Sequence, residues 1–361
     1  MKIATEVRPG ANRYVSGNHI LKDLPNYLSD FKALSVLTGE KSFAAFSQFY
    51  KKMLPYPIYH YDGTASVENG EALADTIGSA DAILAIGGGR LIDTAKVTAR
   101  ALNCELIIIP TLVSNCAAYT PIGALYHTDH TFDQVAYFPR VSYLTLVDYD
   151  FLLDTPHDYL VAGIGDTLAK WYEMEGIIRH ETLNALPASV HLGFAAAKVI
   201  FKILFEDSAQ ALSDLKNHDA SAAFGRIADT VIELSGTVGG FAGAYGRMSG
   251  AHALHNGLSL LTETHEILHG SKVAYGVLVQ LAYTNDFEEI KKLLPFYKSS
   301  ELPTQLQALH LKKFDAIQLQ PVADFAASKE ESYRLIDPDV TGSKILSAIE
   351  ALENFVAQDI S

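Results

Sequence analysis

A run of three consecutive glycines between a buried strand and a helix is the feature that most restricts how this chain can fold. The apolar residues 82–86 predict a strand, Gly87, Gly88 and Gly89 follow, and helical periodicity continues through Lys96. Bare glycine backbone at a helix start lets a pyrophosphate approach the N–H groups closely. The pattern is neither Gly-x-Gly-x-x-Gly nor a Walker A loop, so a tight turn without a ligand stays open as the alternative.

The first part of the chain alternates short apolar runs with helical periodicity, which is typical of a mostly parallel sheet. Strands are predicted at residues 33–37, 58–61, 82–86 and 106–109. Three of these strands end in a turn signal, at Gly39, at the glycine run and at Thr111. Because ligands of open α/β sheets bind beyond the carboxyl ends of the strands, we expect these turns to form one rim. Residues 137–147 are expected to add a hairpin or extra strands.

The second part of the chain has a helical pattern instead. Apolar residues at a period of 3.6 predict helices at residues 190–205, 222–234, 272–283 and 344–356. A single core rarely grows beyond roughly 250–300 residues, and this chain has 361. We therefore predict an α/β domain over residues 1–153 and an all-helical domain over residues 154–361.

The composition excludes several classes of protein. With 28 basic and 42 acidic side chains the net charge is −14, which argues against a nucleic-acid partner because phosphate contacts need clustered Lys and Arg. Two cysteines, Cys104 and Cys116, do not indicate a disulfide framework, so we expect a reducing cytoplasm. The N-terminus lacks an apolar leader and no uncharged apolar run reaches the ~18 residues of a membrane span, so no membrane partner is expected.

Four histidines lie within residues 252–269, and neutral imidazole is a common ligand of divalent cations. His252 and His255 are spaced i, i+3, and His265 and His269 are spaced i, i+4, so each pair can share one helix face. One histidine from each pair can therefore meet at one ion, although the spacing does not say which. Surface or capping histidines are the alternative interpretation.

A third ligand is expected from Asp166. We predict that this aspartate opens an amphipathic helix directly after the turn Gly163-Ile-Gly165. Two imidazoles and one carboxylate leave coordination positions free, as a catalytic rather than a structural metal site requires.

Four motifs together resemble those of the iron-containing, or group III, alcohol dehydrogenases, in their glycerol dehydrogenase-like branch. They are Gly87-Gly88-Gly89-x-x-x-Asp93-Thr-Ala-Lys96, Gly163-Ile-Gly-Asp166, Ala251-His252-Ala-Leu-His255-Asn-Gly and His269-Gly-Ser-Lys-Val-Ala-Tyr-Gly. Their order and spacing match over nearly the whole chain. The resemblance implies a Rossmann-like dinucleotide-binding domain, an all-α C-terminal domain, and a divalent metal in the cleft between them.

The resemblance also selects the metal ligands. It implies Asp166, His252 and His269 as ligands, with His255 as an outer or substrate-facing neighbour. Many members of the family carry a further histidine four positions after the aspartate, where this chain has Lys170. This departure favours a three-ligand zinc site and weakens an assignment of iron, with nickel and manganese as other candidates.

The resemblance implies NAD(H) or NADP(H) as the cofactor. A carboxylate after the second strand would bind the adenine ribose of NAD and repel the extra phosphate of NADP. Gly39 stands near that place and Lys41 is available to a phosphate, which favours NADP, whereas Glu40 keeps NAD open. The residues expected to bind the cofactor are Gly39, Lys41, Gly87, Gly88, Gly89, Asp93, Lys96, Thr111, Ser114, Thr120, Ile122 and Tyr126.

The substrate is inferred from a second departure. Glycerol dehydrogenases carry an aspartate that faces the polyol hydroxyls in the loop where this chain has Cys116. A thiol removes that acceptor and also removes a charge that would repel an anion. The motifs here are most similar to those of hydroxycarboxylate dehydrogenases, which interconvert 2-oxo and 2-hydroxy acids. Cys116 and Lys170 are therefore candidate substrate contacts, and Lys170, Arg247 and Lys272 are candidates for holding its carboxylate.

The predicted function is thus a metal-dependent oxidoreductase acting on a small molecule. The ion would act as a Lewis acid on the substrate oxygen, a hydride would pass to or from the nicotinamide, and protons would leave through His255 or water. A glycerol dehydrogenase with NAD is the main alternative. A lyase resembling 3-dehydroquinate synthase is more remote because its basic cluster is not found, and a nucleotide-binding sensor is disfavoured because all three ligands are present. A homo-oligomer is expected.

Overall fold

The structure, a computed structural model, describes residues 6–129 and 131–359, which form two compact units. The sheet unit comprises Arg8–His157 and Ser213–Thr237. The helical unit comprises Asp158–Leu212, the chain from Val238 onward and the few described residues before Arg8. The predicted division between residues 153 and 154 differs from this one mainly at Ser213–Thr237, which packs with the sheet.

The sheet unit is built on six parallel strands. In chain order they are β1 (Arg13–Gly17), β2 (Leu34–Thr38), β3 (Ile58–His60), β4 (Ala82–Gly87), β5 (Glu105–Pro110) and β8 (Leu144–Asp148). Their order across the sheet is β3-β2-β4-β5-β8-β1, and every neighbouring pair is parallel. The four predicted strands are confirmed to within one residue at each end, whereas β1 has no counterpart in the prediction.

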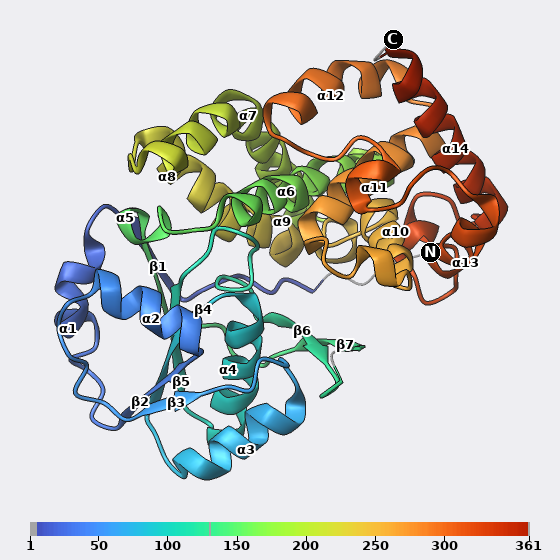
Figure 1. Cartoon of the computed structure of the whole chain (residues 1–361). Coiled ribbons are helices and arrows are strands. Elements are labelled where there is room, and N and C mark those ends of the chain that lie inside the picture. Colours follow the sequence, from blue (N-terminus) through green and yellow to red (C-terminus); the bar gives the residue numbers. More distant parts are fainter. Residues whose placement is uncertain (1–5, 130, 360–361) are drawn as a thin grey trace. The chain divides into compact units, whose positions relative to one another are not determined.

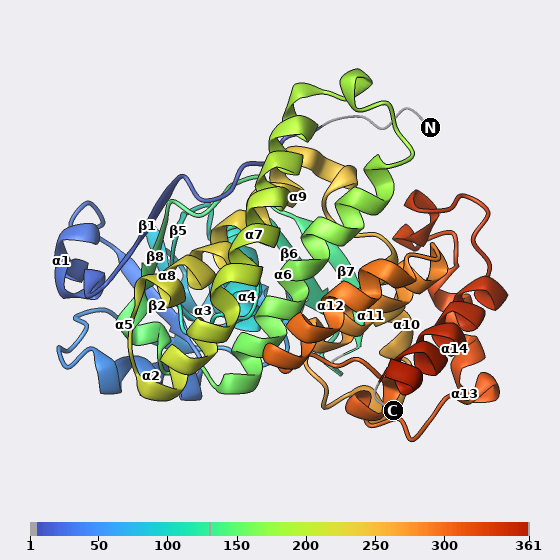
Figure 2. The same ribbon diagram turned by 90° about the horizontal axis from the view of Figure 1, so that it is seen from above.

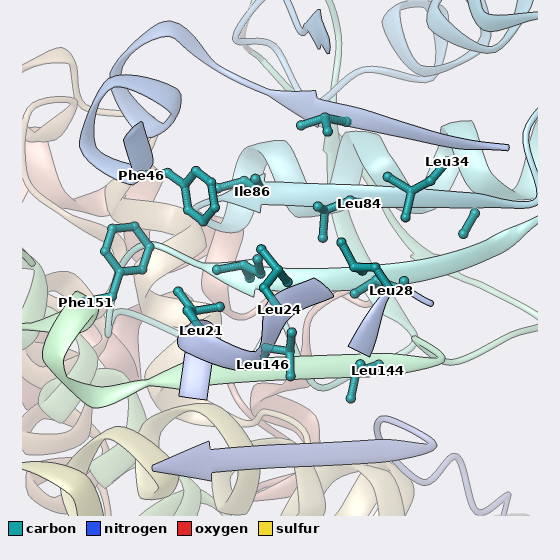
Figure 3. Close-up of a cluster of buried hydrophobic side chains, with 14 residues drawn as sticks. Leu21, Leu24, Leu28, Leu34, Phe46, Leu84, Ile86, Leu144, Leu146 and Phe151 are labelled. Atoms are coloured by element: carbon teal, nitrogen blue, oxygen red, sulfur yellow. The ribbon is translucent and has the colours of Figure 1, made fainter. Parts of the chain in front are cut away.

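Helices cover both faces of this sheet. The 3-10 helix Ile20–Asp23, α1 (Leu24–Tyr27), α2 (Glu40–Phe49) and α5 (Tyr149–Leu152) lie on one face, and α3 (Val67–Ile77) and α4 (Gly89–Leu102) lie on the other (Figure 1). Alternate residues of the central strands point to the first face and pack with Leu24 of α1, with Leu21 and Leu28 on either side of this helix, and with Phe46 and Phe151 (Figure 3). Strands buried on both faces need continuous apolar runs, which is why the sequence pattern predicts them well.

The connections reverse direction between β2 and β4. From β2 the chain passes through α2 to the edge strand β3, and from β4 it passes through α4 the opposite way to β5. Because parallel crossovers are right-handed, these helices must lie on opposite faces, and a crevice opens beyond the carboxyl ends of the two strands. Gly39 follows β2 and Gly88 follows β4, so both turns lie at this point of the sheet.

Of the two alternatives predicted for residues 137–147, an extra strand is confirmed by β8, whereas a hairpin at this position is wrong. The hairpin is formed earlier, by the antiparallel strands β6 (Ile122–Tyr126) and β7 (Phe132–Tyr137). β8 instead enters the parallel sheet between β5 and β1, fully buried. The hairpin is held by α4, whose Asp93 accepts from Ala124 N at 3.1 Å. This tie between distant residues has no signal along the chain.

The segment Ser213–Thr237 joins the sheet unit through a half-buried carboxylate. α8 (Ala222–Asp229) ends at Asp229, whose oxygens accept hydrogen bonds from Tyr14 at 2.8 Å, Ser16 at 3.1 Å and Tyr149 at 2.7 Å. The periodicity of residues 222–234 predicts a helix there, and a π-helical turn, Thr230–Leu234, completes it. The unit on which the helix packs is decided by hydroxyl groups from β1 and α5, far away in sequence.

The helical unit contains most of the second half of the chain. Its helices are α6 (His157–Ile178), α7 (Ala188–Asn217), α9 (Ser235–Ala242), α10 (Gly250–Leu258), α11 (His269–Tyr283), α12 (Phe287–Ser299), α13 (Ala316–Ala326) and α14 (Gly342–Asp359). One end of each of α6, α7 and α9 consists of residues that belong to the sheet unit. Helices α10, α11, α13 and α14 pack together (Figure 2). The helical prediction for this region is confirmed. Amphipathic periodicity predicts these helices because each one buries its apolar face, and the pattern is the same whichever part of the chain that face packs against.

Helix α7 has the length and composition of a membrane span, with a mean hydropathy of 1.6 in its most apolar window and 28% of that window buried. Among the described residues it is the one helix of this kind. Lys198 and Lys202 lie in its middle, so it contains no uncharged apolar run of the ~18 residues that a membrane span needs. Core helices of soluble proteins have the same composition, so this helix is weak evidence for a membrane.

Candidate active site

Three helices of the helical unit bring Asp166, His252 and His269 together. Asp166 lies on α6, His252 on α10, and His269 is the first residue of α11. Asp166 Oδ1 is 3.3 Å from His252 Nε2 and 3.5 Å from His269 Nε2, and one ligand atom from each residue lies within 4.8 Å of the others. The structure therefore brings together the two histidines and the aspartate that the resemblance selected.

The prediction that Asp166 opens a helix is wrong, because α6 begins nine residues earlier, at His157. Gly163 and Gly165 are helical, and Gly165 permits close packing. A Cβ atom on Gly165 would lie 2.8 Å from the Gly270 carbonyl oxygen, and one on Gly270 would lie 1.9 Å from the Ala162 carbonyl oxygen. Glycine on both helices lets α6 and α11 approach backbone to backbone, and this contact brings His269 to Asp166.

Asp166 Oδ1 carries the clearest sign that the three residues suit a cation. This buried oxygen has no hydrogen-bond donor among the described residues, although the two imidazole Nε2 atoms face it. Burial alone would raise the pKa of Asp166, but the two histidine rings lower it well below its usual value, so the carboxylate is ionised. A buried carboxylate facing two ring nitrogens is a donor set that suits a borderline divalent cation.

Glu173 fixes the orientation of His252 and was not predicted as a site residue. His252 Nδ1 is 2.7 Å from Glu173 Oε2, and Glu173 Oε1 accepts from the backbone N–H groups of Ser249 at 2.6 Å and His252 at 2.9 Å. The carboxylate holds a ring proton on Nδ1, so Nε2, which faces Asp166, is the ring nitrogen available to a metal ion. The signal in the sequence was the spacing of seven residues between Asp166 and Glu173, which places both on one face of α6.

His255 lies behind His269. His269 Nδ1 is 3.0 Å from His255 Nε2. Burial first, and then the neighbouring cationic groups, hold the pKa of His255 well below its usual value, so its ring is neutral. His265 does not share a helix face with His269, because α11 begins at His269, and its Nε2 donates to the Ser259 carbonyl at 3.1 Å instead.

The three candidate contacts for a substrate carboxylate all lie within the helical unit. Lys170 is buried one turn beyond Asp166 on α6, and its ammonium donates to the Arg247 carbonyl at 2.8 Å. Lys272 is buried too and donates to Ser259 Oγ at 3.1 Å, and burial lowers its pKa to about 8. Lys272 therefore holds the loop that precedes α11. Burial acts most strongly on Asp166 and Glu173 and raises the pKa of both, but their histidine neighbours and, to a smaller extent, the charge of Lys170 bring both pKa values below normal.

The glycine turn of the sheet unit leaves a helix start bare. Gly88 precedes α4 and makes no side-chain cap, and no acidic residue lies in the first turn of that helix. Its N–H groups therefore face outward at the point where the sheet order reverses, as anion binding requires. Cβ atoms at Gly88 and Gly89 would lie 2.8 Å from the side chains of Leu112 and Asn115. The glycines thus also permit close packing of the next loop, which was the alternative interpretation.

The other predicted cofactor residues differ in their surroundings. Gly39 caps α2, with Lys41 exposed beside it, and Thr111 follows β5 with its N–H bonded to the Gly87 carbonyl at 3.2 Å. Asp93 and Lys96 form a buried ion pair of 2.9 Å that holds the hairpin, since Lys96 also donates to the Ile122 carbonyl at 2.6 Å. Their positions are explained by this structural role. Tyr126 ends β6 beneath the guanidinium of Arg90, at 5.8 Å.

The loop with Ser114, Cys116 and Thr120 is braced within the sheet unit. Asn115 Oδ1 accepts from Ala117 N at 2.9 Å, and the carbonyl of Cys116 accepts from Tyr119 N and Thr120 N at 3.0 and 3.1 Å. Cβ atoms on Gly236 would lie 2.7 to 2.8 Å from Tyr119 and Thr120. The loop is thus held in a defined shape against residues of the segment Ser213–Thr237.

We expect the two cysteines to differ strongly toward an alkylating reagent. Cys104 is buried, and burial raises the pKa of its thiol to about 11, so only about one thiol in a thousand is ionised at pH 8. Cys116 is partly exposed. Mass spectrometry after brief iodoacetamide treatment at pH 8 should find the label on Cys116, with Cys104 reacting only in denaturant. Labelling of Cys104 at an equal rate in the folded protein would contradict its burial.

Comparison with known proteins supports a common origin over the whole chain. Residues 11–149 match the sequence profile described as iron-containing alcohol dehydrogenase. Hydroxycarboxylate dehydrogenase A of Escherichia coli (strain K12) is 35% identical over 275 residues, covering 76% of this chain and 75% of that enzyme. Glycerol dehydrogenase of Thermotoga maritima is 30% identical over 370 residues, covering 98% of both chains. The chain belongs to the iron-containing alcohol dehydrogenase family.

Solved structures of this family show the same fold. A probable glycerol dehydrogenase from Sinorhizobium meliloti 1021 superimposes with a TM-score of 0.87 at 28% identity, covering 98% of this chain and 100% of that one. The predicted fold, a Rossmann-like α/β domain followed by an all-α region, is confirmed. As a member of the iron-containing alcohol dehydrogenase family, the chain is a dehydrogenase that uses a nicotinamide cofactor and a metal ion and acts on a small molecule.

Proposed function

We propose that this dehydrogenase interconverts a 2-oxo acid and a 2-hydroxy acid with NADP(H). The observation that carries the reaction class is the convergence of the ligand atoms of Asp166, His252 and His269, at which a buried Asp166 oxygen accepts no hydrogen bond. Two features support the substrate class: a thiol, Cys116, in place of a carboxylate, and the 35% identity to a hydroxycarboxylate dehydrogenase. Lys170 and Cys116 are the proposed substrate contacts.

The proposed metal is zinc, held by Asp166, His252 and His269. Bound there it would supply Lewis acidity at the substrate oxygen, while the nicotinamide would supply or accept the hydride. Asp166 keeps its negative charge in the buried site, and Glu173 holds His252 in the tautomer that presents Nε2. His255 is neutral and lies behind His269, where it can pass a proton toward solvent.

The preference for NADP is supported by the surroundings of Gly39. A Cβ atom at this position would lie 2.8 Å from Cε1 of Tyr61, so the ring occupies the place of a carboxylate side chain that would repel the extra phosphate. Lys41, in the first turn of α2, is exposed and is the nearest basic residue in sequence. We propose that Gly87, Gly88 and Gly89 receive the pyrophosphate and that the loop of Thr111, Ser114 and Thr120 lies beside the nicotinamide half.

A glycerol dehydrogenase with NAD is the second candidate. The relative from Thermotoga maritima, named a glycerol dehydrogenase, is matched over 98% of its length, whereas the hydroxycarboxylate dehydrogenase is matched over 75%. Glu40 begins α2 and is exposed, so it can turn toward the ribose of NAD. We further propose that the protein is a cytoplasmic homo-oligomer, in keeping with its composition and its family.

A substrate screen tests the proposal directly. Zinc-loaded protein is assayed with NADPH and NADH against 2-oxo acids, dihydroxyacetone and simple aldehydes, and in the reverse direction against glycerol. We expect the highest kcat/KM for a 2-oxo acid with NADPH. Cys116→Asp should lower that value by about tenfold, because a like charge beside the substrate carboxylate costs roughly 1.4 kcal/mol at a partly exposed position. The control is Cys116→Ser, which removes the thiol without adding a charge. The other cysteine, Cys104, cannot serve as a control site because it is buried and a charge there would destabilise the fold.

Two results would contradict the substrate assignment. One is a preference of the wild type for glycerol and NAD. The other is an equal loss of 2-oxo acid activity in Cys116→Ser and Cys116→Asp, which would show that charge at this position is irrelevant.

A further inference from the structure

His269 is the member of the metal cluster that packing restrains least. Its side chain is 50% exposed, whereas that of His252 is 11% exposed and is fixed by its direct hydrogen bond to Glu173. An exposed imidazole can rotate and can carry its proton on either ring nitrogen. Some other device must therefore keep the Nε2 lone pair of His269 directed at Asp166.

A chain of hydrogen bonds leads from His269 to a carboxylate. His269 Nδ1 is 3.0 Å from His255 Nε2, and His255 Nδ1 is 2.9 Å from Asn256 Oδ1. Asn256 Nδ2 donates to both oxygens of Glu331, at 3.0 and 3.2 Å. Asn256 and His255 are neighbours on α10, and Glu331 directly precedes the 3-10 helix Ser332–Leu335.

The direction of this chain is fixed from its outer end. An ionised carboxylate only accepts hydrogen bonds, so Asn256 must turn its NH₂ group toward Glu331 and its carbonyl oxygen toward His255. The carbonyl only accepts, so His255 must carry its proton on Nδ1 and accept on Nε2. His269 must then donate from Nδ1, which leaves Nε2 unprotonated. Each proton position follows from the one before it.

We propose that Asn256 and Glu331 are positioning residues that hold His269, through His255, in the tautomer that binds metal. The inference rests on the proposed metal site and goes beyond it. Glu331 acts on His269 across two intervening side chains in the way that Glu173 acts on His252 in direct contact. Each histidine of the cluster thus has its own outer carboxylate, an arrangement that raises metal affinity and fixes ring orientation.

Metal affinity, rather than turnover, tests this proposal. Metal-free full-length protein is titrated with Zn²⁺ in competition with a chromophoric chelator, and the visible absorption of the Co²⁺-loaded protein is recorded as a second readout. Glu331→Gln should weaken Zn²⁺ binding on the order of tenfold and alter the Co²⁺ bands, because a glutamine amide can donate as well as accept and no longer fixes the direction. Glu330→Gln is the matched control, since Glu330 is the exposed neighbour with the same charge.

A double variant distinguishes an effect on the direction of the hydrogen bonds from a general structural effect of the substitution. Asn256→Asp combined with Glu331→Gln places a carboxylate directly behind His255 and a donor behind that carboxylate, so the direction of the chain is restored. Zn²⁺ affinity should then recover toward that of the wild type. Equal affinities of Glu331→Gln and Glu330→Gln, or no recovery in the double variant, would overturn the proposal. Failure of the wild type to bind Zn²⁺ would overturn the metal site as well. No substrate enters these measurements, so they do not depend on the 2-oxo acid assignment.

Discussion

Replacing Asp166 by asparagine is expected to abolish metal-dependent turnover while leaving the fold intact. The amide keeps the volume of the side chain but removes the only anionic member of the cluster, so Zn²⁺ affinity should fall by more than the 10–100-fold typical of outer residues. Loss of a Lewis acid worth several kcal/mol corresponds to a decrease in kcat on the order of 10³-fold. Metal content by elemental analysis and kcat are measured on the same sample.

The fold of the Asp166→Asn variant needs its own control. The two histidine rings lower the pKa of Asp166, so they stabilise its charge, and the metal-free variant should melt below the metal-free wild type while still unfolding cooperatively. The holo wild type should melt higher than both, because a ligand of the native state stabilises it by mass action. A variant with full zinc stoichiometry and full turnover would remove Asp166 from the metal site.

Replacing Gly270 by alanine should have the largest effect on stability. The new Cβ would lie 1.9 Å from the Ala162 carbonyl oxygen, with backbone on both sides of the contact, so α6 and α11 must separate. Overpacking of this kind costs about 3 kcal/mol or more in the free energy of unfolding. The same movement draws His269 away from Asp166, so Zn²⁺ affinity should fall together with the melting temperature.

Ser271→Ala is the matched control for this substitution. Ser271 is the next residue of the same helical turn and is only half-buried, so the change should leave both quantities close to those of the wild type. If Gly270→Ala melts and binds zinc as the wild type does, α6 and α11 do not approach as closely as the structure has them.

Much of the fold could be predicted because its determinants are local. Strands buried on both faces give continuous apolar runs, and helices buried on one face give a period of 3.6, so β2, β4, β5 and the helical second half were recoverable, together with the edge strand β3. The hairpin was misplaced and β1 missed for the opposite reason. β6 and β7 are held by the buried Asp93 and Lys96 on α4, and β1 is a short, half-exposed edge strand, so neither has a strong pattern of its own.

In the candidate site, too, the local determinants could be predicted and the contacts between distant residues could not. Residue types and motif order within the sequence identified Asp166, His252 and His269, because metal chemistry restricts which side chains can serve as ligands. Spacing alone could not choose between His252 and His255, and it misjudged Asp166 as the start of a helix. Only the tertiary structure placed Asp166 in mid-helix, because the glycines there permit the close approach of α11 rather than a turn.

The chain by itself determined most of the elements, the family and the chemical types of the ligands, since each of these depends on residues near one another or on motifs with fixed order. The tertiary structure alone decided which groups stand behind the ligands. Glu173 is seven residues from Asp166 but meets His252 on another helix, and Glu331 reaches His269 through two residues of α10. Hydrogen bonds between segments so far apart depend on how the helices pack, and no local pattern records that packing.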